Sequence, residues 1–392
     1  MMFKMNEGDY STLGAITNKN QITFTFEGEK EDVCSIVLIH KETGAKEKIE
    51  VPVEYCLGSL RSITVFGINS REYMYYYEIN GEEVTDTYAR VISGREIWND
   101  ETRKEREYKI YGAFLSDNFS WGSDIQPEVP KSQMVMYKLH VRGFSMASKV
   151  PDKMKGTFSA IRNKIPYLKD LGITTLELMP IYEFEEMTIP VKKDLKLPSY
   201  VKWAPTKKDL IKPTVVEHEK KKVNYWGYSE GSYFAVKASY AQEPQKASVE
   251  FKRLVKYLHE QGMECILDMH FPNNTDHNLI LSALRFWVKE YHVDGFHLMG
   301  PSLPLTAIVQ DAVLSRTKIF ASGFDGIYQR NKKYKNLYIY KEEYQYPARR
   351  LLNHFDCNIS DFVDQQKKQS DTFGYVNYIA SNNGSNICTY RK

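Results

Sequence analysis

The sequence has few cysteines, no long apolar run and no strong excess of either charge. Its five cysteines are scattered, odd in number and without a CxxC pair, which excludes a disulfide framework and predicts reduced thiols in a cytoplasmic protein. No window approaches the length of a membrane-spanning helix, and residues 1–14 lack the apolar core of a signal peptide. We therefore expect neither membrane association nor secretion.

The net charge and the absence of several sequence motifs argue against further classes of function. A net charge of +3 at pH 7 is too small to imply a nucleic-acid partner. The sequence contains no P-loop, no dinucleotide-binding fingerprint, no HExxH and no nucleophile elbow. The enzyme classes that those signatures identify therefore find no support in this chain.

Aromatic residues, in contrast, are abundant. The chain has 28 tyrosines, and its aromatic share is 13%. Tyrosine rings can stack on sugars, but they also fill the cores of β-rich domains. Composition alone favours the second interpretation.

The first hundred residues predict a β-sandwich, because short alternating segments are separated by turns rich in glycine, asparagine and lysine. We expect this domain to span residues 1–118 and a linker of charged and turn-forming residues to span 119–132. The predicted strands include residues 21–26, 34–39, 48–53 and 73–79.

From residue 133 to residue 392, helical segments alternate with buried strands. A helix that leads into a buried strand is the repeating unit of a parallel α/β barrel, whose chemistry lies at the carboxyl ends of the strands. We expect Ser248 to cap the second of the predicted helices. The predicted helices are residues 157–171, 248–261 and 278–291, and the clearest predicted strands are residues 264–271 and 293–299.

Four segments resemble one known family. They are residues 133–144 (QMVMYKLHVRGF), 174–182 (TTLELMPIY), 224–241 (NYWGYSEGSYFAVKASYA) and 293–300 (VDGFHLMG). Together they resemble the α-amylase superfamily, glycoside hydrolase family 13, in its pullulanase and isoamylase branch. The resemblance implies a (β/α)8 TIM barrel preceded by an immunoglobulin-like β-sandwich of the carbohydrate-binding type.

The sequence ends before the eighth barrel strand of that family. An incomplete barrel exposes strand edges and apolar core. We therefore expect a fragment, a marginally stable fold, or a partner chain that completes the barrel.

The resemblance also implies that the catalytic carboxylates are replaced. Met299 stands at the position of the nucleophilic Asp, Ser322 at that of the general acid Glu, and Asn383 at that of the stabilising Asp. A thioether cannot act as a carboxylate nucleophile, and a serine hydroxyl cannot protonate a leaving glycosidic oxygen. The resemblance thus predicts the fold of a glycosidase without its activity.

The substrate-binding positions are better preserved. Tyr228 matches a tyrosine that stacks on the sugar ring, Asp268 matches a conserved Asp, and His297 replaces an Arg. The implied ligand is an α-glucan such as glycogen, starch or maltodextrin, bound without a metal or organic cofactor and without hydrolysis. The other implied contacts are Trp226, Asn273, Asn274 and Asn382.

Two alternatives stay open at this point. Weak hydrolysis could proceed through relocated carboxylates, for which Asp268, Asp294 and Asp325 are the nearest by sequence. Alternatively, the barrel could be a non-enzymatic scaffold. In that case, the lysine-rich insertion at residues 183–223 would provide the contact surface for an anionic partner.

Overall fold

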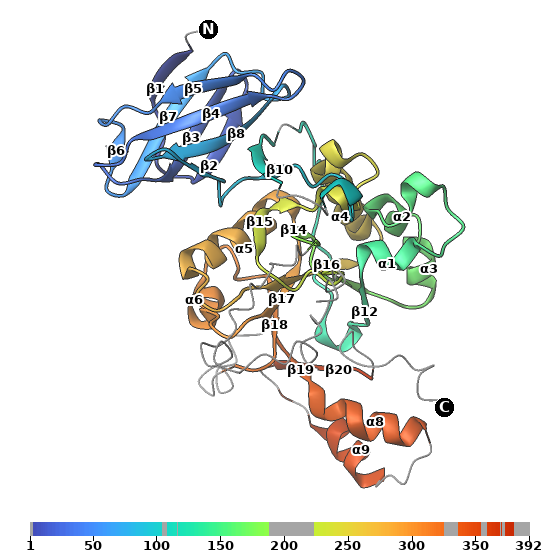
Figure 1. The fold of residues 1–392 in the computed structure, drawn as a ribbon. Coiled ribbons are helices and arrows are strands. Elements are labelled where there is room, and N and C mark those ends of the chain that lie inside the picture. The colour runs from blue at the N-terminus through green and yellow to red at the C-terminus, as the bar shows by residue number, and fades with distance from the viewer. Residues whose placement is uncertain are drawn as a thin grey trace, which may run out of the picture.

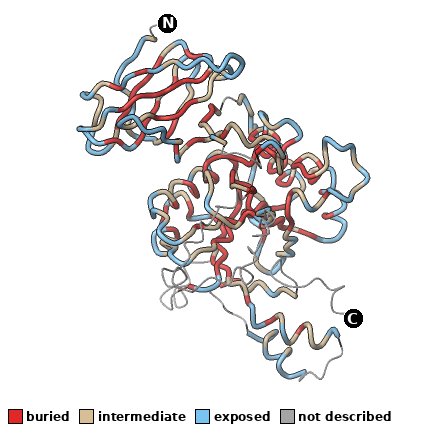
Figure 2. The backbone as a smooth tube through the Cα atoms, viewed as in Figure 1, coloured by how far each residue is buried: buried red, intermediate tan, exposed pale blue. Residues whose placement is uncertain are grey.

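The computed structural model describes residues 3–103, 108–115, 117–187, 223–324, 336–353, 359–368, 370 and 373–379. Two antiparallel sheets come first in the chain, and a curled parallel sheet follows them (Figure 1). Buried residues lie along the strands of the two antiparallel sheets and along the parallel strands (Figure 2). The predicted order, a β-sandwich followed by an α/β barrel fold, is confirmed.

The sandwich consists of eleven short strands in the described part of the chain. They are β1 (Lys4–Glu7), β2 (Gly14–Asn18), β3 (Gln21–Glu27), β4 (Cys34–His40), β5 (Lys46–Glu50), β6 (Cys56–Leu57), β7 (Leu60–Phe66), β8 (Tyr73–Ile79), β9 (Glu82–Val84), β10 (Val91–Ser93) and β11 (Tyr111–Ala113). One sheet has the order β1-β7-β3-β2, with β6 beside β7. The other has the order β10-β11-β8-β4-β5, with β9 beside β8.

The core of the sandwich follows from the alternation of side chains along its strands. Ile36 and Leu38 of β4 belong to the core between the sheets. There Phe26 stacks on Tyr77, with ring centroids 4.1 Å apart. The predicted strand at residues 48–53 is shifted, because β5 ends at Glu50.

The second sheet contains seven parallel strands that pair in the order of the chain. They are β12 (Met136–Leu139), β13 (Thr175–Leu178), β16 (Glu264–His270), β17 (Gly295–Met299), β18 (Lys318–Ala321), β19 (Leu337–Lys341) and β20 (Phe373–Asn377). The strands β14 (Tyr182–Phe184) and β15 (Gly231–Val236) form a separate antiparallel pair. Because all seven strands run the same way, their carboxyl ends meet at one edge of the sheet.

Helices lie between most of the consecutive strands of the parallel sheet along the chain. They are α1 (Val141–Ser145), α2 (Phe158–Arg162), α3 (Ile165–Asp170), α4 (Ala247–Glu260), α5 (His277–Tyr291), α6 (Leu305–Gln310), α8 (Gln345–Leu352) and α9 (Ile359–Lys367). In α5, the buried residues Ile280, Leu284 and Trp287 recur at helical spacing. Among the described residues, no helix has the length and apolarity needed to cross a bilayer.

Two predictions about the helices were wrong. The single helix expected at residues 157–171 is two short helices, because Pro166 in the first turn of α3 has no backbone N–H to continue the ladder of α2. Ser248 is not the N-cap of α4: the helix begins one residue earlier, at Ala247. The Ser248 hydroxyl instead donates a hydrogen bond to Asp117 at 2.8 Å.

Candidate functional site

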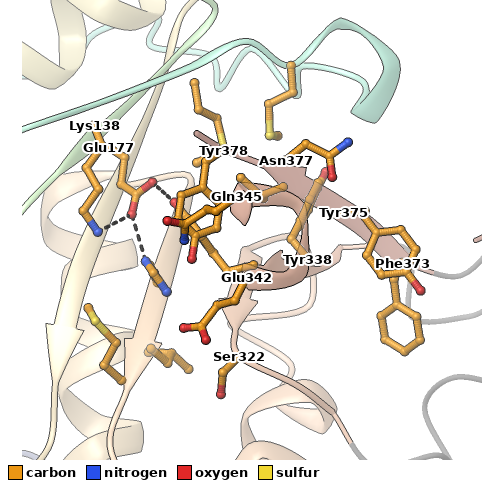
Figure 3. A pocket seen from close by; sticks show the side chains of 18 of the residues that line it. Lys138, Glu177, Ser322, Tyr338, Glu342, Gln345, Phe373, Tyr375, Asn377 and Tyr378 are labelled. Atoms are coloured by element: carbon orange, nitrogen blue, oxygen red, sulfur yellow. Dashed lines mark hydrogen bonds and ion pairs between the residues drawn. The ribbon is translucent and has the colours of Figure 1, made fainter. Parts of the chain in front are cut away.

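A cavity of about 1300 Å³ opens on the inner face of the parallel sheet (Figure 3). It is lined by residues of β12, β17, β19 and β20, and by the first turns of α8. β12 and β20 are the two outer strands of the sheet in the described part of the chain, and both contribute to the wall. Its volume exceeds the roughly 300–1,000 Å³ of an ordinary small-molecule pocket.

Four ionisable side chains meet at the base of the cavity, and we call them the Lys138 cluster. They come from four consecutive strands of the sheet. Lys138 lies beside Glu177 in the strand register, and Asp268 lies beside His297. The members of the cluster are Lys138, Glu177, Asp268 and His297.

The Lys138 ammonium bridges the two carboxylates of the cluster. Its Nζ lies 3.0 Å from Glu177 Oε1 and 2.6 Å from Asp268 Oδ2. His297 Nδ1 lies 2.9 Å from Glu177 Oε1 and 3.6 Å from Asp268 Oδ1. Both carboxyl side chains are at most 1% exposed, whereas Lys138 is 23% exposed. The ammonium is therefore the part of the cluster that a ligand in the cavity can approach.

Two tyrosines complete the base of the cavity. The Tyr228 hydroxyl donates a hydrogen bond to Asp268 Oδ2 at 2.6 Å. The Tyr340 hydroxyl donates to Glu177, and its ring stacks on His297 with centroids 4.0 Å apart and planes 3° apart. These contacts fix the orientation of both rings at the cavity wall.

The pKa values of the two carboxyl groups in the cluster are shifted in opposite directions. Burial disfavours the charge on Glu177, but Lys138 and His297 together hold the pKa of Glu177 below its ordinary value. For Asp268, burial prevails over the attraction of Lys138, and the pKa of this carboxyl group is raised. Burial also opposes the charges of Lys138 and His297, yet the carboxylates raise the pKa of both groups. Lys138 is therefore a fixed cation rather than an amine nucleophile.

Glu177, Asp268 and His297 also have the composition of a metal-ligand set. Their ligand atoms lie within 4.8 Å of one another. However, the ammonium of Lys138 contacts both carboxylates and supplies the positive charge that a metal ion would bring. The residues present therefore fit a lysine-centred cluster better than a metal site.

The structure brings together only part of the predicted site. Tyr228, His297, Met299 and Ser322 line the cavity, and Asp268 lies fully buried beneath it. No carboxylate occupies position 299 or 322. Trp226 packs edge-on against Tyr225 and His140, outside the cavity lining.

Four further predicted residues lie elsewhere. Asn273 and Asn274 are exposed on the turn after β16 and do not line the cavity. Asn382 and Asn383 lie outside the described residues, as does Asp325. Most of the lysine-rich insertion also lies outside them.

One of the proposed relocated carboxylates was wrong. Asp294 precedes β17, at the opposite end of the strand from Met299. Its Oδ2 lies 3.0 Å from His259 Nε2 and accepts a hydrogen bond from the backbone N–H of Cys265. Because it lies at the amino end of the strand, Asp294 cannot take part in chemistry in the cavity.

Sequence reasoning did not assign roles to Lys138, Glu177 or Tyr340. Lys138 was noticed only as a replacement for a family Glu, and Glu177 only as part of a matching motif. The sequence did contain an indication of a functional role, because Lys138 and Glu177 each lie near the carboxyl end of a predicted barrel strand. Their contact depends on strand register, which the alternation of residues does not specify.

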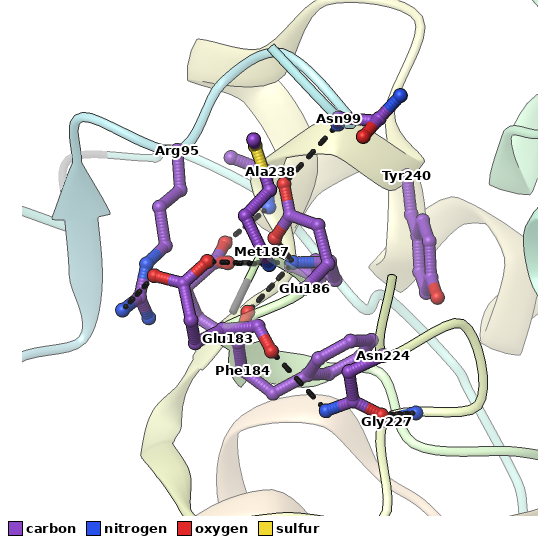
Figure 4. A network of polar contacts seen from close by, with 12 residues as sticks. Arg95, Asn99, Glu183, Phe184, Glu186, Met187, Asn224, Gly227, Ala238 and Tyr240 are labelled. Atoms are coloured by element: carbon purple, nitrogen blue, oxygen red, sulfur yellow. Dashed lines mark hydrogen bonds and ion pairs between the residues drawn. The ribbon is translucent and has the colours of Figure 1, made fainter. Parts of the chain in front are cut away.

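Lys237, which is fully buried, belongs to a second polar network, and Figure 4 shows Glu183, Glu186 and Asn99 of that network. Lys237 Nζ donates hydrogen bonds to Glu183, to Glu186 and to the carbonyl of Phe184, each at 2.9 Å. Arg103 and the backbone N–H of Asn99 also contact Glu186. We call these residues the Lys237 network, and it ties residues 95–103 to the β14–β15 pair.

Several known proteins are similar to this chain in sequence. Isoamylase 3, chloroplastic, from Oryza sativa subsp. japonica is 26% identical over 490 aligned residues, which cover 99% of this chain and 60% of that protein. The glycogen debranching enzyme of Enterobacter sp. (strain 638) is 28% identical over 321 residues, covering 66% of this chain and 45% of the enzyme. The chain is a homologue of isoamylases and glycogen debranching enzymes. It spans about half the length of these curated relatives, and no family model matches it.

Solved structures show the same fold. The pullulanase type I from Bacillus subtilis str. 168, complexed with maltose, has a TM-score of 0.62 and 18% identity, over 87% of this chain and 52% of that one. The product complex of the glycogen-degrading pneumococcal virulence factor SpuA has a TM-score of 0.63 and 19% identity, over 87% of this chain and 41% of that one. The family resemblance inferred from the four motifs is thus confirmed, while the loss of catalytic carboxylates stays a prediction.

Proposed function

We propose that this chain binds an α-glucan, such as glycogen, starch or maltodextrin, in the cavity and does not hydrolyse it. The observation that carries the proposal is the composition of the cavity wall. Met299 and Ser322, which the resemblance aligns with the nucleophile and the acid of the family, line the cavity together with Tyr228, which it aligns with a sugar-stacking tyrosine. The names of the relatives, which include glycogen debranching enzymes, support the choice of ligand.

The Lys138 cluster supports the same proposal. Retaining glycosidases need one carboxylate free to attack and another able to give a proton. Glu177 and Asp268 are both buried, and both are engaged by Lys138. Weak hydrolysis through Asp268 therefore has less support than binding alone, and the scaffold hypothesis rests on residues that lie mostly outside the described ranges.

Calorimetric titration with maltoheptaose tests the proposal. We expect binding by the wild-type protein and a loss of about tenfold or more in affinity for Tyr228→Ala, because the base-of-cavity ring and its hydrogen bond to Asp268 are removed. Tyr167→Ala is the matched control, because Tyr167 is exposed on α3, outside the cavity lining. Its affinity should equal that of the wild type.

Reducing-end release from glycogen and pullulan tests the second half of the proposal. We expect no release that depends on Tyr228. The proposal fails in its binding half if maltoheptaose does not bind at millimolar concentration. It fails in its non-catalytic half if the wild type releases reducing ends and Tyr228→Ala, purified in parallel, does not.

A further inference from the structure

Three polar side chains from one helical face line the cavity opposite the Lys138 cluster, and we call them the polar wall. They are Glu342, Gln345 and Arg349. Glu342 begins the 3-10 turn Glu342–Tyr344, and the other two lie on α8, which follows directly. Spacings of three and four residues place side chains on the same face of a helix. The three side chains of the polar wall therefore face the cavity together.

Glu342 differs from the cluster carboxylates in having no partner within the described residues. Its side chain is exposed and extends into the cavity near Ser322 (Figure 3). No hydrogen bond or ion pair involves its carboxylate in the described ranges. Arg349 follows seven residues later, which corresponds to about 10 Å along a helix. A carboxylate in a cavity with its acceptor capacity unused is available to a ligand.

One other member of the wall is anchored. Arg349 donates its Nε–H to the carbonyl of Ile379. This contact ties α8 to the segment that follows β20. Glu342 thus precedes a helix that is fixed to the sheet, and its carboxylate has no hydrogen-bond partner among the described residues.

The chemistry of a free carboxylate beside aromatic rings restricts the ligand. A carboxylate is an acceptor with two oxygens, so it suits the paired hydroxyl donors of a sugar ring. Tyr338 and Tyr340 of β19 offer apolar faces on the same cavity. The negative charge of the carboxylate, however, repels a phosphate or a uronic acid placed at the same position.

We propose that Glu342 selects neutral glucans over anionic ones by accepting hydrogen bonds from their hydroxyl groups. This inference rests on the proposed glucan-binding function and names its ligand class more closely. The ligand is an uncharged oligosaccharide, and a phosphorylated maltodextrin of equal length is disfavoured. Glu342 acts here as a specificity-determining residue.

The experiment compares two ligands and four proteins by calorimetry. The ligands are maltoheptaose and maltoheptaose that carries a phosphate ester. The proteins are the wild type, Glu342→Gln, Glu342→Asp and Glu343→Gln. Glu343 is a matched control, because it is an exposed carboxylate of the same turn that does not line the cavity. Thermal melts establish that each variant is folded.

We expect the wild type to prefer the neutral ligand by about tenfold, the scale of one charged hydrogen bond. Glu342→Gln should lose most of this preference, because an amide keeps an acceptor but not the charge. Glu342→Asp and Glu343→Gln should retain it. An unchanged preference in Glu342→Gln, with maltoheptaose still bound, overturns the role of Glu342 alone. Absence of binding of either ligand to the wild type overturns the glucan-binding function itself.

Discussion

Lys138 and Lys237 each lie between two carboxylates, but the two ammonium groups differ in how completely their hydrogen-bonding capacity is used. Lys237 is fully buried, and its ammonium donates three hydrogen bonds, which uses every proton it has. Lys138 also lies between two carboxylates, but it is 23% exposed to the cavity. Beneath it, Asp268 Oδ1 has no hydrogen-bond partner among the described residues.

This difference indicates that the Lys237 network has a structural role, whereas the Lys138 cluster is available to a ligand. The Lys237 ammonium has no proton left for a ligand, although Arg103 Nε and Nη1 and Asn99 Oδ1 of the same network have no hydrogen-bond partner among the described residues. What distinguishes the Lys138 cluster is its open side, where the ammonium is partly exposed to the cavity. Each of the predictions below tests whether the two lysines differ in this way.

The largest effect should come from disrupting the Lys237 network. Lys237→Met leaves Glu183 buried without a cation and Glu186 with Arg103 alone, and we expect a loss of about 3–5 kcal/mol in the free energy of unfolding. Lys138→Met should cost less, roughly 1–3 kcal/mol, because that side chain is partly solvated and His297 and the tyrosine hydroxyls still contact the carboxylates. Urea unfolding measures both. Equal costs would contradict the distinction between the two lysines.

A smaller effect on the free energy of unfolding, which depends on pH, should be found for the Lys138 cluster and not for the Lys237 network. Burial opposes the charge on His297, but the neighbouring carboxyl groups of Glu177 and Asp268 prevail and raise the folded-state pKa of His297 above 6.5. Its protonation therefore stabilises the fold below about pH 6.5, and this stabilisation is lost as pH rises through the raised pKa. The difference in unfolding free energy between wild type and His297→Gln should shrink from about pH 6 to pH 9.

The Lys237 network provides the control for this pH dependence. It contains no imidazole, so the cost of Lys237→Met should not shrink as pH rises, because the buried carboxylates left behind cost more when they are ionised. A cost for His297→Gln that does not change with pH would show that the histidine is uncharged in the fold.

The smallest effect should come from the rim of the Lys237 network. Arg95 pairs with Glu185 at 3.0 Å, and the glutamate is 33% exposed. Partly exposed pairs contribute little, so Arg95→Gln should lower the free energy of unfolding by less than about 1 kcal/mol. A cost near that of Lys237→Met, measured by the same unfolding experiment, would mean that the network extends to the surface.

Much of the fold could be predicted from the sequence because it depends on local pattern. The alternation in residues 21–26 and 34–39 predicted β3 and β4, and the apolar face at residues 278–291 predicted α5. Boundaries were less accurate where one residue changed the backbone, as Pro166 did between α2 and α3. The domain limits at residues 118 and 132 and the idea of a partner chain completing the barrel stay predictions.

The candidate site could be predicted only in part. Tyr228, His297, Met299 and Ser322 were found because each lies within or beside a recognisable motif, and all four line the cavity. Glu342 was missed because it belongs to no motif and starts a short helical turn. The roles of Lys138, Glu177 and Tyr340 were missed because their partners lie on other strands.

The sequence by itself determined the order of strands and helices and the family resemblance, and it predicts which side chains replace the family carboxylates. These properties depend on residue identity and on periods of two and 3.6 residues, which are local. Only the tertiary structure decided that Lys138 lies between Glu177 and Asp268, and that Glu342 lines the cavity without a hydrogen-bond partner in the part of the chain that the structure describes. The physical reason is that register and sheet curl set which inward side chains meet, and a shift of two residues would preserve every alternation while separating them.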